Sequence, residues 1–561
     1  MTEQGNPVPR RISIFRDRFF WLAFFIGGFF LLLTLWYSFG MDQSAYAYGA
    51  WVWKHYGLPP YIGAFDQNFP GIFIIHRLAL ALFGESIFGF RLFDFLVQLS
   101  SLLMIFYLTK RLSGSGRAGF LAGVFYGIYY YGLGSFDTGQ REGYVLWLLL
   151  MALILSLTLK NQSRLRAILV GLILGFAFLV KPFYGLSWPV FIAWFLMEGI
   201  PAESQKAGRK WAKFFPELCL FAFGCLLPSA LIISYYWKSG YLREMYQAVI
   251  LYNFGAYGLD LPVSPSSPWW EKPVIVVYSI SWPNPIIIFS GMFALLLKLG
   301  NPREIKDHKL FWAIFFLSLA GLISYWLQGK FFPYQQIPLM ALMMIFSGMV
   351  FCRLGGKFQE QIRPGRRPVF TLIFYGGLIF LNLISISPDL VDFSCRHTFR
   401  NLDRAYLGGL NKSVDTHFSS NNYLAAKKLK EMIQPEDEME FFGPYPLIPF
   451  LLKKKLPSRF GCVQHLLFLP ESGPMLSLQK QWINEYTEAV IRTRPRFFLV
   501  SDDFPGHTHK FFRLASRSLK QALREKFPEL QKFLEQNYQL IFQQGVIEVY
   551  ELKKASPEKG Q

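Results

Sequence analysis

The chain has 561 residues and a mass of 65.0 kDa, with 52% hydrophobic residues, 17% charged residues and a formal net charge of +20. A soluble protein of this size would carry about 25% charged residues. This composition excludes a disordered chain and argues against a single soluble globule. A long chain with so many apolar and aromatic residues favours a polytopic membrane protein.

Eleven apolar runs predict helices that cross a bilayer, which takes about 20 residues each. They lie near 19–39, 86–109, 118–135, 143–159, 165–180, 183–197, 215–236, 274–297, 310–327, 334–351 and 369–387. The stretch 71–83 is also apolar but shorter, and it is typical of an interfacial or re-entrant helix. The expected fold is therefore a polytopic α-helical membrane protein with about 11 transmembrane helices.

The positive charge is spread unevenly over the segments between these runs. If the N-terminus lies in the cytoplasm, the cytoplasmic segments hold 23 Lys and Arg against 8 Asp and Glu, and the outer loops hold 8 against 8. This is the positive-inside pattern of a multi-pass protein of the cell membrane. It accounts for most of the net charge, so no nucleic-acid-binding surface is required.

Eleven crossings from a cytoplasmic start place the residues from 388 onwards outside the cytoplasm. Their pattern is mixed, with helices expected after Ser420, at 479–493 and at 510–527, short strands at 439–443 and 496–503, and a hairpin around Gly545. We therefore divide the chain into a transmembrane module, 1–387, and an extracytoplasmic α/β domain, 388–561. Cys395 and Cys462 fall in this domain and could form a disulfide.

The first outer loop, residues 40–85, is long for a connector and rich in Trp, Tyr and Pro. Asp42 follows the first span directly, and the loop continues through Asp-Gln-Asn-Phe-Pro-Gly at 66–71 and Leu-Phe-Gly-Glu-Ser at 82–86 to Arg-Leu at 91–92. We expect the loop to lie on the outer face of the membrane. Arg91 and Asp94 are spaced i, i+3 on one helix, which favours a buried ion pair.

These residues resemble the first extracytoplasmic loop of the GT-C membrane glycosyltransferases that use polyprenyl-phosphate sugars. That group includes protein O-mannosyltransferases and lipid A aminoarabinose transferases. Its pattern has an acid after the first helix, a D-x-K-P-P-G-like segment, and an L-F-G-x-S…R-L entry to the next span. Gln43, Asn68 and Phe69 depart from that pattern.

The resemblance implies transfer of a sugar from a polyprenyl-phosphate donor to an extracytoplasmic acceptor, which is a lipid, a glycan or a protein. Such a reaction needs a base for the acceptor hydroxyl and positive charge or a metal ion for the departing phosphate. Asp42 is the expected base, and its alternative role is to cap a helix or loop. Asp66 could orient the acceptor, bind a divalent metal ion or cap a turn. Asn68 is a substrate-binding candidate by its place in the motif.

Further candidates for binding the donor lie at the mouths of other spans. Gln140 and Arg141 stand in the second outer loop, where Arg141 could contact the phosphate or simply be neutralised by neighbouring acids. Lys181 ends the fifth span, and Lys330 and Tyr334 lie between the ninth and tenth. A lysine at an outer helix mouth is suited to hold a phosphate, although lysines also reach either interface without any function.

Two other functions fit a chain of this kind. One is a transporter or lipid flippase, which would carry charges near mid-membrane in broken helices. The other is a non-catalytic envelope assembly protein, in which Asp42 would have no task. The clustering of polar residues at outer loop mouths favours chemistry at the membrane surface.

Overall fold

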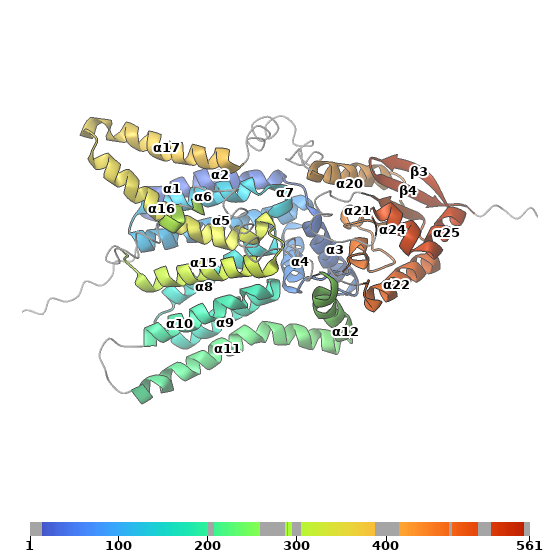
Figure 1. The fold of residues 1–561 in the computed structure, drawn as a ribbon, viewed down its shortest axis with the longest axis horizontal. Coiled ribbons are helices and arrows are strands. Elements are labelled where there is room, and N and C mark those ends of the chain that lie inside the picture. Colours follow the sequence, from blue (N-terminus) through green and yellow to red (C-terminus); the bar gives the residue numbers. More distant parts are fainter. Residues whose placement is uncertain are drawn as a thin grey trace, which may run out of the picture.

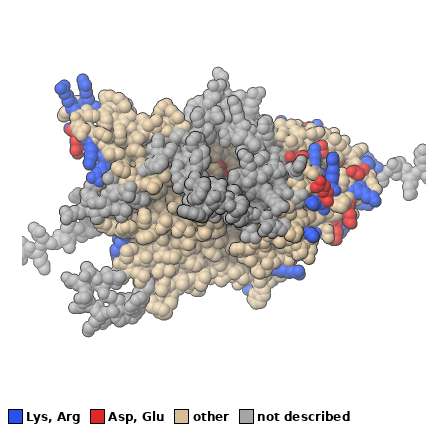
Figure 2. Space-filling model, in the orientation of Figure 1, with Lys and Arg blue, Asp and Glu red and all other residues tan. Residues whose placement is uncertain are grey.

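The computed structural model describes residues 14–199, 207–257, 287–288, 290–293, 305–386, 414–469, 474–502, 516 and 518–554. Long helices run side by side through most of the molecule, and a smaller region with a β-sheet lies at one end of them (Figure 1). On the face drawn in Figure 2, the charged side chains gather at the two ends of the molecule, and the coloured surface between them is almost uncharged. This is the distribution expected for a body that sits in a bilayer.

Eight helical segments of the described part are long and apolar enough to cross a membrane. They are Arg18–Trp36 (α1 and α2 with short η segments), Ile87–Ser113 (α5), Arg141–Thr158 (α8), Ser163–Val180 (α9), Phe215–Lys238 (within α11, Ala207–Lys238), His308–Gln328 (α15), Pro333–Glu360 (η7 and α16) and Pro364–Ile384 (η8 and part of α17, Arg367–Ile386). All eight coincide with predicted spans.

The other three predicted spans have different outcomes. Those at 118–135 and 183–197 correspond to shorter helices, α6 (Gly116–Gly132) and Pro182–Met197, which includes most of α10 (Trp188–Gly199). The span predicted at 274–297 lies almost entirely outside the described residues. The total of eleven crossings therefore stays a prediction.

The first outer loop folds into two helices, α3 (Met41–Tyr56) and α4 (Gly71–Phe83). The short helix at 71–83 is confirmed. The position of the loop on the outer face of the membrane stays a prediction. Within the protein, α3 is buried from Gln43 to Trp53. Its buried Trp and Tyr side chains belong to the hydrophobic core, and α3 packs against α4 and α21 (Leu447–Leu452).

The C-terminal region forms a four-stranded sheet with the order β1-β2-β4-β3. β1 (Met439–Phe442) and β2 (Phe497–Ser501) are parallel, and β4 (Ile547–Leu552) pairs antiparallel with β2 and with β3 (Tyr538–Gln544). The parallel strands β1 and β2 are buried along their whole length, as is typical of parallel strands that helices cover. The helices are α20 (Val414–Lys430), α21, α22 (Ser477–Thr493), α24 (Leu519–Lys526) and α25 (Pro528–Asn537).

The predicted strands and the terminal hairpin are confirmed at the level of these elements. The helix expected after Ser420 is already under way at Val414, so the expected start is wrong. Cys462 carries a free, buried thiol, and Cys395 lies outside the described residues.

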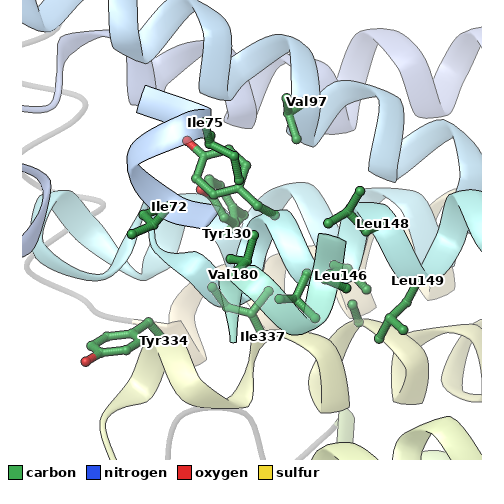
Figure 3. Close-up of a cluster of buried hydrophobic side chains, with 14 of the residues drawn as sticks. Ile72, Ile75, Val97, Tyr130, Leu146, Leu148, Leu149, Val180, Tyr334 and Ile337 are labelled. Carbon is green, nitrogen blue, oxygen red and sulfur yellow. The ribbon is translucent and has the colours of Figure 1, made fainter. Parts of the chain in front are cut away.

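The sheet region and the helices share one hydrophobic core. A single cluster of buried side chains joins Ile72 of α4 and Phe90 of α5 to Met439 of β1 and Ile448 of α21. Figure 3 shows the part of this cluster in which α4, α8, α9 and α16 meet. The predicted boundary at 388 lies outside the described residues, and the division into two domains stays a prediction.

Candidate active site

Asp42 lies in the first turn of α3, where the helix N-terminus favours a negative charge. The Gln140 side-chain amide donates a hydrogen bond to Asp42 Oδ2 at 3.1 Å. Burial raises the pKa of Asp42 above its usual value, and the charge of Arg141 and the bond from Gln140 oppose that shift. The carboxylate is thus half-buried and held among polar groups.

Two side chains fix the start of α3 to the second outer segment. Gln43 Nε2 donates to the carbonyl oxygen of Phe136 at 2.9 Å. Arg91 donates to the carbonyl oxygens of Tyr37 at 3.2 Å and Ser135 at 3.0 Å. Together they set the position of Asp42 relative to the segment that carries Gln140.

The predicted ion pair between Arg91 and Asp94 is wrong. Asp94 accepts hydrogen bonds from the Tyr130 hydroxyl at 2.8 Å and from Gln98 Nε2 at 3.0 Å. The Arg91 guanidinium bonds instead to backbone carbonyls and to Thr138 Oγ1, at 2.9 Å. The helical spacing places both side chains on one helix, but other partners satisfy each of them, and those of Arg91 come from other segments.

The Asp66–Asn68 turn is the second part of the site. Asp66 Oδ1 accepts from the Asn68 backbone N–H and from its side-chain amide, both at 2.7 Å. Asn68 in turn accepts a hydrogen bond from the Arg141 guanidinium through its side-chain oxygen. Burial raises the pKa of Asp66 to about 7. The turn-capping geometry expected of Asp66 is present, and its other two expected roles stay predictions.

Lys181 follows α9 and forms a buried ion pair with Glu142, with 3.1 Å between Nζ and Oε1. Burial and the charge of Arg141 lower the pKa of Lys181 to about 8, while Glu142 opposes this shift. Both Glu142 and Lys181 lie within electrostatic reach of Asp42. From the sequence, Glu142 is one of the acids expected to neutralise Arg141, because nothing in the local spacing indicates a lysine partner.

Lys330 and Tyr334 approach the site from the α15–α16 connection. Lys330 Nζ donates to the Tyr257 carbonyl oxygen at 2.9 Å and lies 3.5 Å from the centre of that ring. Tyr334 lies within electrostatic reach of Asp42 and Arg141. In Figure 3 its phenol points away from the apolar side chains of the core. The structure thus gathers all eight predicted site residues, which come from segments far apart in the sequence.

The C-terminal region contributes residues that sequence analysis missed. Tyr445 lies within electrostatic reach of Asp42, and Cys462 within reach of both Asp42 and Asp66. A side-chain hydrogen bond joins Tyr445 to Gln464. No local signal marks these residues, because only the packing of the sheet region on α3 brings them here.

Several buried polar atoms of the site have no hydrogen-bond partner among the residues that the structure describes. They are Oε1 of Gln67, Gln140 and Gln464, and Nε of Arg141. A buried polar group without a partner costs about 1–3 kcal/mol, so each such group calls for an explanation. A polar ligand or water would satisfy them.

The described part of the site offers few ligands for a metal ion. Among the described residues, no three or more His, Cys, Asp or Glu side chains are grouped so that they could hold one. Asp42 and Asp66 are two carboxylates near each other, but the Asn68 side-chain oxygen between them accepts from Arg141. We therefore assign no catalytic step to a metal, and the divalent ion stays a prediction.

An apolar groove of about 600 Å³ lies beside the site. Its lining includes Phe69 and Pro70, which follow Asn68 directly. The remaining lining residues come from α9, α11, α12 (Leu242–Tyr246) and the η5 segment (Gln247–Tyr257), among them Phe178, Ile232, Ile233 and Val249.

Comparison with known proteins gives related matches at the level of family, sequence and fold. Residues 67–234 match the family model described as dolichyl-phosphate-mannose-protein mannosyltransferase. The chain is 26% identical over 364 residues to an undecaprenyl phosphate-alpha-4-amino-4-deoxy-L-arabinose arabinosyl transferase of Edwardsiella ictaluri, covering 61% of this chain and 59% of the relative. It is also 26% identical over 257 residues to the transferase of the same name from Pseudomonas aeruginosa, covering 43% of each chain.

A solved structure shares the fold. The oligosaccharyltransferase of Archaeoglobus fulgidus, tethered to an acceptor peptide with an NVT sequon, matches with a TM-score of 0.50 and 11% identity, covering 88% of this chain and 70% of that one. The family and sequence comparisons agree with the resemblance of the first outer loop to the GT-C membrane glycosyltransferases, and the solved structure shows a similar fold. The matched region spans about half the length of the curated relatives.

Proposed function

We propose that this protein is a glycosyltransferase that moves a sugar from a polyprenyl-phosphate donor to a hydroxyl of an extracytoplasmic acceptor. The observation that carries this proposal is the set of groups around Asp42. A half-buried carboxylate lies within electrostatic reach of Arg141 and Lys181, among polar atoms that have no hydrogen-bond partner in the described part of the chain. The names of the sequence relatives support a lipid-phosphate sugar as donor.

In the proposed reaction Asp42 takes the proton of the acceptor hydroxyl, as a positioned general base does. The acceptor oxygen attacks the anomeric carbon and forms the new C–O bond. The bond from that carbon to the phosphate oxygen breaks, and the lipid phosphate leaves with the electron pair. One direct displacement of this kind inverts the configuration at the anomeric carbon.

The cations of the site are placed to stabilise the leaving phosphate. Arg141 uses one nitrogen for Asn68, and its Nε has no partner in the described ranges of the chain. Lys181 is oriented by Glu142, and Lys330 by the Tyr257 carbonyl. Preorganised positive charge in a site without bulk water stabilises a developing anion far better than the same charge in water.

The apolar groove would hold the lipid part of the donor. Its lining includes Phe69, directly after the Asn68 that binds Arg141, so a phosphate at Arg141 would have its lipid chain close to the groove. A transporter or flippase would instead carry charges near mid-membrane in broken helices. In the described part of the chain, the candidate site residues lie where the helices meet the sheet region, which favours catalysis.

Asp42→Asn tests this function. The neutral side chain keeps its shape but cannot take a proton, so we expect sugar transfer to fall by about 10²–10⁴-fold. Purified protein in lipid vesicles would be given labelled undecaprenyl-phosphate sugars, with membrane extracts as acceptors.

Glu85→Gln is the matched control, because Glu85 is an acid of the same loop that forms an exposed ion pair with Lys54 at 2.7 Å. It should retain wild-type transfer. An Asp42→Asn protein that folds and transfers sugar at the wild-type rate would contradict the proposal.

A further inference from the structure

We propose that Arg459 is a positioning residue through which the C-terminal region sets the geometry of the catalytic loop, the segment 57–70 that carries Asp66 and Asn68. This inference rests on the proposed function. Arg459 belongs to a short segment, residues 456–460, which we name the strap. The strap runs between strand β1 and the catalytic loop.

The strap is anchored to the sheet and to α3. Glu440 of β1 is fully buried, and its two oxygens accept from the backbone N–H of Ser458 and of Phe441, both at 2.9 Å. The Leu456 N–H donates to the Tyr48 hydroxyl of α3 at 2.8 Å. These hydrogen bonds hold the backbone of the strap in place independently of the Arg459 side chain.

Arg459 then contacts the catalytic loop from two sides. Its Nη1 donates to the Tyr61 carbonyl oxygen at 2.7 Å, and its own carbonyl oxygen accepts from the Phe65 N–H at 2.6 Å. The rest of the guanidinium forms a two-point ion pair with Glu485 of α22, at 2.7 and 2.8 Å. Such a fork holds the planar group in one orientation.

The loop that Arg459 contacts has a conformation that needs support. Tyr61 has φ of 78°, in the left-handed region that a bulky residue rarely adopts and that costs about 1–3 kcal/mol. The Tyr61 hydroxyl donates to the Asn68 carbonyl oxygen at 2.7 Å. Asn68 contacts both Asp66 and Arg141. A change at Arg459 thus reaches the site through Tyr61 and Asn68.

Three variants separate the contact with Tyr61 from the ion pair with Glu485. Arg459→Gln weakens both. Glu485→Gln removes the ion pair but leaves Arg459 able to donate to Tyr61. The double variant Arg459→Glu with Glu485→Arg restores an ion pair but has no donor for the Tyr61 carbonyl. Arg496→Gln is the matched control, because Arg496 also bridges two acids, Asp437 and Glu551, and does not contact the loop.

We expect kcat for sugar transfer to fall about 10- to 100-fold in Arg459→Gln and in the double variant, the size expected when reacting groups are displaced by about 1 Å. Glu485→Gln and Arg496→Gln should stay within about threefold of wild type, since exposed ion pairs contribute little. Full activity in Arg459→Gln would overturn the inference. So would a double variant that regains wild-type kcat, because the ion pair alone would then suffice.

Amide hydrogen exchange tests the contact without any substrate. In Arg459→Gln, and not in Arg496→Gln, the amides of residues 61–68 should exchange faster, and unchanged exchange there would overturn the inference. If the wild-type protein transfers no sugar, the proposed function fails, while this measurement still decides whether Arg459 holds the loop.

Discussion

At the scale of single residues, the site depends on how burial and neighbouring charges act against each other on two carboxyl groups. Burial raises the pKa of both Asp42 and Asp66, whereas Arg141 acts in the opposite direction on each. A base of raised pKa is better matched to proton transfer near neutral pH than an exposed aspartate. In a protein without a catalytic function, burying these carboxyl groups would only lower the stability of the fold.

The proposed role of Asp42 as the base predicts how sugar transfer depends on pH. A base acts only when ionised, so kcat/KM should fall as the pH falls through the raised pKa of Asp42. Gln140→Met removes a hydrogen bond that favours the ionised form. The pKa of Asp42 should rise further, and the acid limb of the pH–rate profile should move to higher pH. A limb that stays in place would show that another group limits the rate.

Arg91 shows how far residue spacing can be interpreted. The i, i+3 relation to Asp94 predicts a contact within one helix. In the folded chain Arg91 reaches the carbonyls of Tyr37 and Ser135 instead. A guanidinium with five donors will bind whichever acceptors surround it, and those come from segments that helical spacing cannot locate.

At the scale of elements, hydropathy alone predicts the long helices well, because a bilayer-spanning helix needs a continuous apolar run. Hydropathy does not decide how α3 is placed, because its Trp- and Tyr-rich sequence is typical both of a membrane interface and of a packed protein contact. The burial of Gln43 to Trp53 decides for the contact. The groove beside the site is also an element-scale feature, since it arises where α9, α11 and α12 meet.

Filling the groove should weaken binding of a long-chain donor. Ile233 of α11 lines the groove and is 49% exposed, so Ile233→Trp can occupy groove volume without disturbing the core. We expect KM for an undecaprenyl donor to rise about tenfold, which corresponds to about 1.4 kcal/mol. The KM for a short-chain donor analogue should change little.

Leu231→Trp is the control for this measurement. Leu231 lies on the same helix, is 61% exposed and does not line the groove. If both variants changed the KM of both donors equally, the groove would not be the binding site of the lipid chain.

At the scale of the whole molecule, the site lies where the helices meet the sheet region, and the two parts share a core. A donor anchored in a membrane and an acceptor in the aqueous phase would meet at such a junction. The arrangement requires the sheet region to be on the outer side, as the charge distribution between the spans predicts.

Cysteine labelling tests this orientation. In a Cys219→Ser background, which removes an exposed native thiol, single cysteines would replace Lys480 of α22 and Asn161 between α8 and α9, both exposed positions. A membrane-impermeant maleimide should label position 480 in intact cells and position 161 only after permeabilisation. The reverse pattern would invert the topology and exclude an extracytoplasmic acceptor.

The sequence alone determined the helical membrane class, the position of most spans and the eight site candidates, because these depend on local apolar runs and on short motifs of the first outer loop. Only the tertiary structure decided that α3 is buried, that Arg91 does not pair with Asp94 and that Tyr445 and Arg459 belong near the site. Arg459 and Tyr61 are 398 positions apart. Contacts over such separations depend on how whole elements pack, and no local pattern of residues encodes them.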